Sequence, residues 1–270
     1  MYEFLSPRTL DEAAAFLAEK PKLKILAGGT DLIIGLRGGV VSCECVMDIK
    51  KIPALSEVKM TDEGLEVGAA ASLNAMLDSG LLTGRYEALA ESASELANGL
   101  LRNRATLAGN ICHASPVGDT LPSALVLDAS VETIAPGGGR RIALRDFFTG
   151  VRENVLAPNE MVIKTVFPKG DGVSAYRKKK RIRGHDLAQV GVAGSYVNGG
   201  LKLAFGAVAP TPVCVDFGTC DLANREAILQ EAMDSISPIS DVRASKEHRM
   251  AMARYLAEQV LDAIAEKAGV

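Results

Sequence analysis

Two glycine-containing stretches carry most of the information about this chain: Leu26-Ala-Gly-Gly-Thr-Asp-Leu32 and Thr106-Leu-Ala-Gly-Asn-Ile-Cys-His-Ala-Ser-Pro-Val-Gly-Asp119. Each combines glycine with short hydroxyl or amide side chains and is flanked by apolar, strand-like residues. Turns of this kind let backbone N–H groups point at an anion, because no Cβ atom blocks close approach. Taken alone, Gly28-Gly29 is equally typical of a strand-to-helix turn. Two such loops in one chain predict a ligand with more than one phosphate, held from both sides.

The size and composition are those of an ordinary folded protein. A chain of 270 residues is long enough for one large domain or two modest ones, and 48% apolar residues can supply a core. The net charge of −3 gives no support to general attraction to nucleic acids or membranes. No apolar run approaches the roughly 20 residues that span a bilayer. Because the first residues also lack a basic leader followed by an apolar stretch, we expect a cytoplasmic protein without a signal peptide.

The cysteines and histidines do not have metal-ligand spacing. The five cysteines form no C-x₂-C pair, and their odd number argues against a disulfide framework. None of the three histidines falls near a cysteine at ligand spacing. We therefore expect no metal or iron–sulfur centre within this chain.

The first part of the chain alternates predicted helices and short strands. Hydroxyl caps, acidic first turns and apolar spacing predict helices over 9–19, 30–38, 72–78, 86–97 and 120–127. Short apolar runs bounded by turn residues predict strands over 22–27, 46–49, 55–60, 65–70, 131–135, 141–144 and 161–167. The glycines at 137–139 join two of these strands in a hairpin.

A second, smaller domain is predicted after the linker-like segment 168–172, so we divide the chain into residues 1–170 and 171–270. Strands are predicted over 174–181, 187–198 and 201–209, followed by helices over 224–234 and 244–267. This order, β-β-β-α-α, indicates an antiparallel sheet backed by helices. The whole chain is accordingly expected to be an α+β protein.

Three stretches occur together, and in the same order, in a known family. They are LAGGTDL at 26–32, RNRATLAGNICHASPVGDTLPSALVLDA at 102–129 and PISDVRASKEHRMAMARYL at 238–256. On these motifs the chain resembles the FAD-binding (medium) subunits of the molybdenum hydroxylases, such as xanthine, carbon monoxide and nicotinate dehydrogenases. The resemblance covers essentially the whole length. It implies an FAD-binding domain of the vanillyl-alcohol oxidase/PCMH type with two subdomains, followed by the small C-terminal domain.

The resemblance also implies which residues hold FAD. One side of the pyrophosphate would be wrapped by Leu26, Ala27, Gly28, Gly29, Thr30, Asp31, Leu32 and Ile33. The other side would be wrapped by Thr106, Leu107, Ala108, Gly109 and Asn110. Asp119 matches an acidic residue at the ribose and adenine end, where a carboxylate can accept hydrogen bonds from hydroxyls. Leu96 and Val162 match apolar residues that pack against the flavin or adenine.

A lysine beyond the linker would approach the isoalloxazine ring. Lys178 matches that lysine, with Arg177 and Lys179 as alternatives, and Tyr176 could pack on the ring. A cation there would favour the reduced, anionic flavin. The chain has Ala108-Gly109-Asn110 where the family usually has Gly-Gly-Asn, so an alanine replaces the first glycine. It also lacks the four-cysteine insertion of some relatives.

Several residues have plainer interpretations. Asp31 could cap the helix that follows it, Asp241 and Arg243 read as an N-cap and an ion pair, and His113 is expected to make a structural hydrogen bond. Arg102 and Asn103 would brace the second loop rather than touch FAD. The basic run at 177–183 is typical of a solvated face, and could equally meet an acidic partner or a nucleotide phosphate.

No residue set in the sequence could activate a small substrate, so the chemistry must be that of the flavin. The resemblance implies an oxidoreductase subunit that takes electrons from a partner and passes them through FAD to NAD⁺ or another acceptor. The expected partners are a large molybdenum-cofactor subunit and a small subunit with two [2Fe–2S] clusters, in an (αβγ)₂ assembly. The alternatives are a self-contained FAD-dependent oxidase or reductase of the same fold and a nucleotide-binding protein without turnover.

Overall fold

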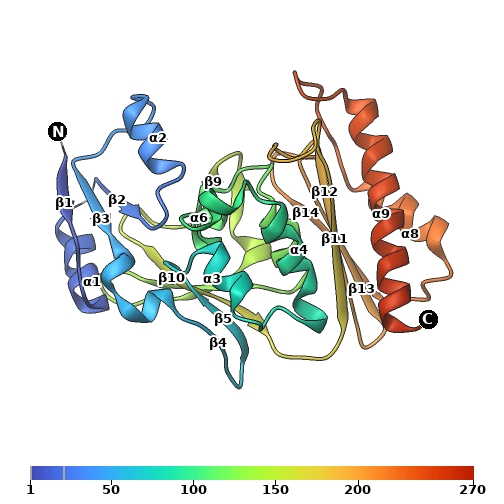
Figure 1. The fold of residues 1–270 in the computed structure, drawn as a ribbon, viewed down its shortest axis with the longest axis horizontal. Coiled ribbons are helices and arrows are strands. Elements are labelled where there is room, and N and C mark those ends of the chain that lie inside the picture. Colours follow the sequence, from blue (N-terminus) through green and yellow to red (C-terminus); the bar gives the residue numbers. More distant parts are fainter. Residues whose placement is uncertain (1, 21) are drawn as a thin grey trace.

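Three β-sheets lie side by side along the long axis of the molecule, with helices between and around them (Figure 1). The computed structural model describes residues 2–20 and 22–270. Within these residues both helices and sheets are present throughout, as expected for an α+β protein. No described helix is long and apolar enough to cross a membrane.

The first sheet is small and parallel. Its strand order is β1 (Glu3–Leu5), β3 (Cys45–Asp48) and β2 (Leu23–Leu26). Helix α1 (Leu10–Glu19) begins at Thr9, whose hydroxyl accepts a hydrogen bond from the Glu12 amide at 3.1 Å. Strand β2 runs directly into the Gly28-Gly29 turn and then into helix α2 (Leu32–Arg37). The predicted strand–turn–helix order at 22–38 is therefore confirmed.

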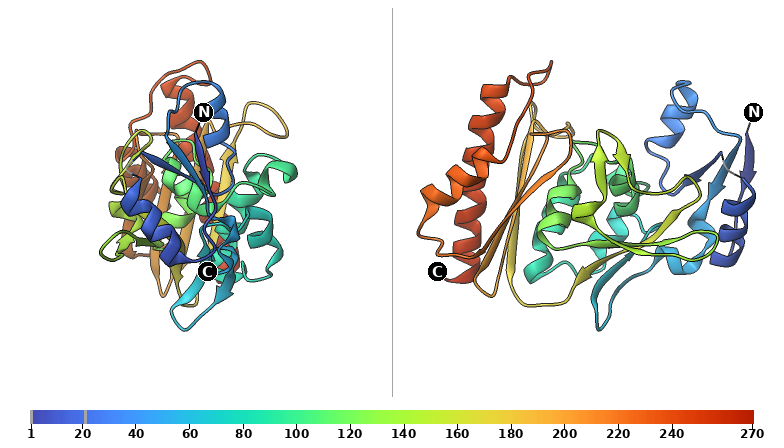
Figure 2. Two further views of the ribbon diagram at one scale, coloured as in Figure 1. Left: turned by 90° about the vertical axis from the view of Figure 1, so that its left-hand side faces the viewer. Right: turned by 180° about the vertical axis from the view of Figure 1, so that it is seen from behind.

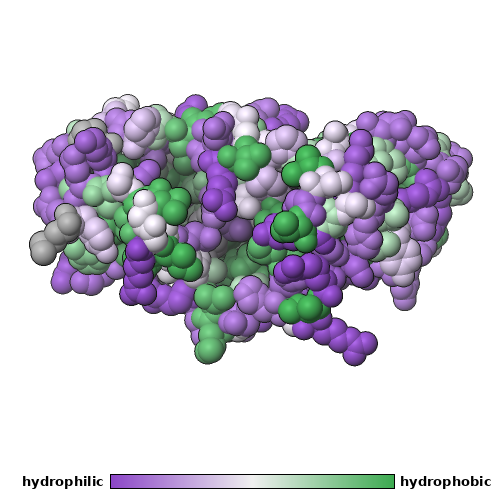
Figure 3. Space-filling model, turned by 90° about the horizontal axis from the view of Figure 1, so that it is seen from above, coloured by the Kyte–Doolittle hydropathy of each residue, from purple (hydrophilic) through white to green (hydrophobic). Residues whose placement is uncertain are grey.

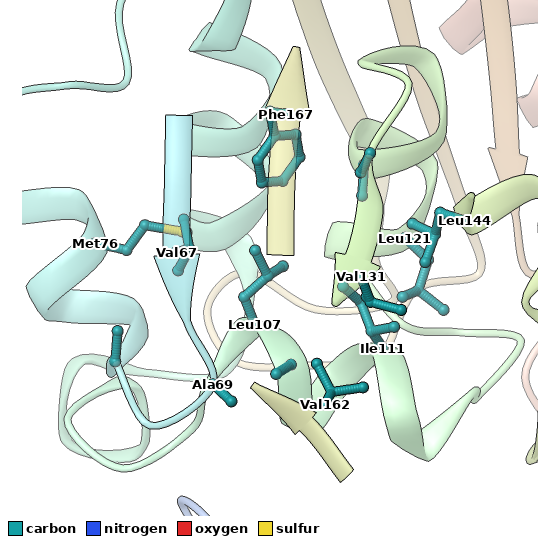
Figure 4. Close-up of a cluster of buried hydrophobic side chains, with 14 of the residues drawn as sticks. Val67, Ala69, Met76, Leu107, Ile111, Leu121, Val131, Leu144, Val162 and Phe167 are labelled. Atoms are coloured by element: carbon teal, nitrogen blue, oxygen red, sulfur yellow. The ribbon is translucent and has the colours of Figure 1, made fainter. Parts of the chain in front are cut away.

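The central sheet is antiparallel, and the helices packed on it enclose the first hydrophobic core. Its strand order is β4 (Val58–Met60), β5 (Gly64–Gly68), β10 (Met161–Pro168), β6 (Ser130–Ile134) and β7 (Arg141–Ala143). The chain between β5 and β6 forms α3 (Leu73–Asp78), α4 (Glu87–Glu95), α5 (Gly99–Arg102), α6 (Leu107–His113) and α7 (Thr120–Val126). A two-stranded ribbon of β8 (Phe148–Gly150) and β9 (Glu153–Asn154) precedes β10. Figure 4 shows Leu107 and Ile111 of α6 pointing into this core beside Val162.

The third sheet has four strands, which corrects the predicted β-β-β-α-α order. The antiparallel order is β11 (Val173–Lys179), β12 (Val190–Val197), β13 (Gly200–Gly206) and β14 (Val213–Thr219). Strand β14 lies at the edge of the sheet, where half-buried Val213, Val215 and Phe217 alternate with exposed residues. Because one face is exposed, the strand has no continuous apolar run of the kind used to predict the buried strands.

Helices cover both faces of this third sheet. Helices α8 (Arg225–Asp234) and α9 (Lys246–Ala268) lie on the outer face, at one end of the molecule, whereas α4 and α7 lie on the inner face (Figure 2). Buried polar contacts cross the inner face. Ser174 donates to the Arg85 carbonyl at 2.7 Å, and Ser195 donates to the Val126 carbonyl at 2.7 Å. The inner face is therefore a packed junction between the central and third sheets.

Several predicted boundaries are wrong in detail. The strand expected at 55–60 begins with a 3₁₀ turn at Pro53–Ser56, because the proline favours a turn, and only Val58–Met60 pair with β5. The strand expected at 187–198 begins at Val190. The last helix is capped by Ser245, whose hydroxyl accepts from the His248 amide at 3.2 Å, and not by Asp241.

Candidate functional site

The two glycine-containing stretches are brought into direct contact. A Cβ atom on Gly28 would lie 1.9 Å from the carbonyl oxygen of Arg104, so only glycine permits this approach. Gly29 has a φ of +77°, a backbone conformation that glycine adopts without strain. Gly28 therefore permits close contact with Arg104 and Ala105, directly before the second stretch, and Gly29 permits the turn between β2 and α2.

Residues 107–113 of the second stretch form helix α6 and only 114–119 are a loop, which corrects the expectation from its glycine and asparagine. The Thr106 hydroxyl accepts a hydrogen bond from the Gly109 amide at 2.9 Å and so caps the helix. The buried face of α6 carries Leu107, Ala108 and Ile111. The opposite side carries the polar residues of the motif. Because Ala108 has a helical conformation rather than a positive φ, its Cβ atom is accommodated, and the departure from Gly-Gly-Asn is harmless.

A cleft lies between the two stretches and extends toward the third sheet. Its inner part is a cavity of about 310 Å³. Its outer part is a cavity of about 800 Å³ that shares six lining residues with the inner part. The shared residues are Thr30, Asp31, Leu96, Ala105, Asn110 and His113. Figure 3 shows the face of the molecule seen from above, where apolar and polar residues surround a central hollow. A cleft of this size accommodates an extended organic ligand.

The lining of the inner cavity combines a polar edge with apolar walls. The polar edge comes from the backbone of Ala27–Leu32 and from the first turn of α6, where the first amides of a helix have no acceptor within the helix. Asn110 is held in place by Thr120, whose hydroxyl donates to Asn110 Oδ1 at 2.7 Å. The apolar walls include Ile25, Ile49, Leu96, Met161 and Val162. Such a lining can hold an anionic group at one edge and a flat apolar ring against the walls.

Most of the predicted site residues line this cleft. The inner cavity is lined by Ala27, Gly28, Gly29, Thr30, Asp31, Leu32, Leu96, Thr106, Ala108, Gly109, Asn110 and Val162. Asp119 lines the outer cavity. Leu26, Ile33 and Lys178 are not among the lining residues, and the Leu107 side chain is fully buried in the core.

Lys178 and Asp119 form a buried ion pair at the junction with the third sheet. Their side chains are only 1% and 6% exposed, and Lys178 Nζ lies 2.8 Å from Asp119 Oδ1. The same ammonium donates to the Glu95 carbonyl at 3.1 Å, and the Tyr176 hydroxyl lies 3.4 Å from Asp119 Oδ1. Burial raises the pKa of Asp119 to about 6, although Lys178 and Tyr176 act in the opposite direction. Asp119 thus separates Lys178 from the outer cavity.

Much of the basic run 177–183 is neutralised within the chain. Arg177 pairs with Glu91 at 3.4 Å, Lys180 with Glu95 at 2.6 Å and Arg181 with Asp186 at 3.1 Å. The first two pairs link β11 and the residue after it to helix α4, and the third lies within the loop that follows β11. Arg177 and Arg181 remain 38% and 50% exposed, so this part of the run is a solvated face whose cations are paired, whereas Lys178 is buried.

Several roles differ from those suggested by the sequence. Asp31 makes no capping hydrogen bond, and its carboxylate lies 3.2 Å from His113 Nδ1. Asp241 pairs with Arg249 rather than Arg243, at 2.8 Å. Asp31 and His113 are far apart in the sequence, so no local pattern signals their pairing, whereas Asp241 and Arg249 are only eight residues apart.

The bracing role expected of Arg102 agrees with the structure. Arg102 donates to the carbonyls of Ser94 and Leu96 at 2.9 and 3.0 Å and thereby braces the segment that precedes α6. All five cysteines are free thiols. Among the described residues, no group of three or more His, Cys, Asp or Glu side chains could hold a metal ion.

Comparison with known proteins assigns this fold and cleft to a family. Residues 1–170 match the FAD binding domain in molybdopterin dehydrogenase. The xanthine dehydrogenase FAD-binding subunit of Escherichia coli O157:H7 is 30% identical over 288 residues, covering 100% of this chain and 99% of that protein. The carbon monoxide dehydrogenase medium chain of Hydrogenophaga pseudoflava is 28% identical and covers 97% of this chain and 96% of its own length.

Solved structures agree with this assignment. Carbon monoxide dehydrogenase from Hydrogenophaga pseudoflava that lacks the Mo-pyranopterin moiety superposes with a TM-score of 0.90 at 26% identity, covering 98% of both chains. Quinoline 2-oxidoreductase from Pseudomonas putida 86 has the same fold, with a TM-score of 0.90 at 23% identity and coverage of 99% and 98%. The chain therefore belongs to the FAD-binding subunits of the xanthine dehydrogenase and carbon monoxide dehydrogenase family of molybdenum hydroxylases.

Proposed function

We propose that this chain passes electrons from the [2Fe–2S] clusters of a partner subunit through FAD to NAD⁺ or another acceptor. One observation supports this proposal above all: the cleft that suits a dinucleotide continues from an enclosed inner cavity to a wider outer one. When bound, FAD supplies both one-electron and two-electron chemistry. The protein then has to bind and orient the cofactor and to leave part of it accessible to donor and acceptor.

The residues of the cleft fit FAD. The proposed diphosphate site lies between the backbone of Ala27–Leu32 and the first turn of α6, with the Thr30 and Thr106 hydroxyls nearby. Leu26 and Ile33 would support the first loop from behind, because a Cβ atom on Gly29 would meet both of their side chains. Leu96 and Val162 would pack against an aromatic ring. These side chains hold and orient the cofactor rather than react.

Asp119 and Lys178 would act at the junction with the third sheet. We propose that Asp119 faces the cofactor, since it lines the outer cavity, and that Lys178 acts through Asp119. The buried ammonium supplies a positive charge behind the carboxylate. This arrangement differs from direct contact between Lys178 and the flavin, the role that the family resemblance implied.

The names of the relatives support the partners proposed for this chain. Those most like this chain bear the names FAD-binding subunit and medium chain. In the xanthine dehydrogenase/oxidase of Gallus gallus, the matching region is only 19% of the whole chain. We therefore propose a large molybdenum-cofactor subunit and a small two-cluster subunit as partners in an (αβγ)₂ complex. We also propose a cytoplasmic location and a division into an FAD-binding domain, 1–170, and a C-terminal domain, 171–270.

The proposal can be tested in two steps. The purified full-length chain should show flavin absorption near ~450 nm and hold ~1 FAD per chain, as expected for one cofactor site. Under anaerobic conditions, NADH should then bleach this absorption if NAD⁺ is the acceptor. Bleaching by dithionite but not by NADH would point to another acceptor. A colourless chain that takes up no added FAD would contradict the proposal, and reduction by a small substrate without partners would favour a self-contained oxidase or reductase.

A further inference from the structure

The inner cavity has very few charged groups for a site proposed to hold a diphosphate. Among the described residues that line it, none is Lys or Arg, one is a carboxylate (Asp31), and one is an imidazole (His113). The diphosphate of FAD is anionic, and a bare carboxylate beside it would oppose binding. The charge state of Asp31 and His113 therefore matters more here than it would in a site rich in lysine.

These two residues are paired across the cleft. His113 Nδ1 lies 3.2 Å from Asp31 Oδ1, and the two side chains are 25% and 68% exposed. Thr30 contributes a longer hydrogen bond, its Oγ1 lying 3.4 Å from Asp31 Oδ2. Asp31 belongs to the first glycine-containing stretch and His113 is the last residue of α6, so the pair joins the two sides of the inner cavity.

The local structure leaves the Asp31 carboxylate available to pair with His113 instead of capping a helix. Asp31 stands at the N-cap position of α2, where an aspartate commonly accepts a hydrogen bond from the helix, but it makes none. His113 is the last residue of α6, and its Nδ1 faces the Asp31 carboxylate at 3.2 Å. The pKa of Asp31 is lowered chiefly by the hydrogen bond from His113, with a weaker contribution from Arg152.

We propose that His113 is a positioning residue that neutralises Asp31 beside the bound cofactor. This inference rests on the proposed function only in requiring that FAD occupies the cleft. In the absence of the imidazole, only the weaker influence of Arg152 would offset the negative charge of Asp31 beside the anionic cofactor. The role differs from that of a brace, because it depends on charge and not on the link between the two stretches.

A double-mutant cycle separates the two roles. The full-length chain is freed of FAD, and the dissociation constant for added FAD is measured by quenching of flavin fluorescence. His113→Gln keeps a hydrogen-bonding side chain but not the charge, and we expect about tenfold weaker binding, the effect of one uncompensated, partly screened charge. Asp31→Asn removes the carboxylate charge, and its own dissociation constant is the reference for the double variant. In that background His113→Gln should weaken FAD binding by no more than about threefold, because no carboxylate remains to be neutralised.

Two controls test whether the effect of His113 on FAD affinity depends on charge. His113→Lys keeps a cation and should bind FAD much as the wild type does, and added salt should narrow the gap between wild type and His113→Gln. Thermal unfolding of each cofactor-free variant reports whether it folds. If Asp31→Asn and His113→Gln weaken binding equally and the double variant recovers nothing, the pair is a brace and the proposal is wrong. Wild-type binding by His113→Gln would also overturn it, whereas a wild-type chain that binds no FAD would overturn the proposed function instead.

Discussion

The two ends of the cleft are built on different principles. At the inner end, the site is formed by backbone and short side chains, and its shape depends on the missing Cβ atom of Gly28. At the outer end, the junction with the third sheet depends on buried charge, with Lys178 and Asp119 almost fully enclosed. The stability of the inner end should therefore be sensitive to added volume, and the stability of the outer end to lost charge. Four predictions test this contrast.

The largest effect is expected from breaking the buried pair. Lys178→Met should lower the free energy of unfolding by about 3–5 kcal/mol at pH 7, because the change leaves Asp119 buried without its partner. Lys180→Met is the matched control: it breaks the more exposed pair with Glu95 and should cost less than about 1 kcal/mol. Urea unfolding followed by circular dichroism measures both. Equal losses would contradict the view that burial makes the junction sensitive.

The pH dependence of stability tests the same end of the cleft. Burial raises the pKa of Asp119 to about 6 in the folded chain, above its ordinary value of 3.8. Asp119 therefore binds its proton more tightly in the folded state than in the unfolded state. Protonation of Asp119 stabilises the fold fully below about pH 4, and this contribution is lost as the pH rises through about 6. The loss should be about 2–3 kcal/mol, taking about 1.4 kcal/mol per pKa unit.

Asp119→Asn provides the comparison for this titration. As the pH rises from 4 to 7, the unfolding free energy of the wild type should fall relative to that of Asp119→Asn. Since most other groups titrate equally in the two proteins, the change in that difference isolates Asp119. Parallel profiles for the two proteins would contradict the raised pKa.

The inner end should respond to a single methyl group. Gly28→Ala would force the two glycine-containing stretches apart, and we expect a loss of about 1–3 kcal/mol of stability, as in an overpacked core, together with much weaker FAD binding. Gly99→Ala is the control, since among the described residues no atom lies within 4 Å of the added Cβ. Equal behaviour of the two variants in thermal unfolding and FAD titration would rule out the role assigned to the glycines.

The same contrast explains what the sequence could predict. The inner end is local: Leu26–Leu32 and Thr106–Asn110 are continuous motifs, and most of the residues predicted from them line one cavity. The strand–turn–helix order at 22–38 is equally local and was predictable. Even here the motif predicts a loop where α6 forms, because glycine and asparagine are weak helix formers, although Thr106 can cap a helix and Leu107 and Ile111 have helical spacing.

The outer end could not be predicted in the same way. Lys178 and Asp119 are 59 residues apart in the sequence, and Tyr176 and Glu91 meet only once the third sheet has packed on α4. The sequence shows the positive charge of the run 177–183, but not the carboxylates with which its residues pair. Strand β14 was missed because an edge strand needs no continuous apolar pattern. Tertiary packing, rather than local preference, decides these features.

The smallest predicted effect concerns the cap of α6 and separates stability from binding. Thr106→Ala should cost about 1 kcal/mol of stability through the lost hydrogen bond to the Gly109 amide, and Thr9→Ala should cost a similar amount through the lost cap of α1. Of these two threonines, Thr106 lines the inner cavity and Thr9 does not, so Thr106→Ala but not Thr9→Ala should also weaken FAD binding. Thr106→Ser should restore both properties. If Thr106→Ala destabilised the chain without changing its affinity for FAD, this end of α6 would be structural, and the inner site would depend on the first glycine-containing stretch alone.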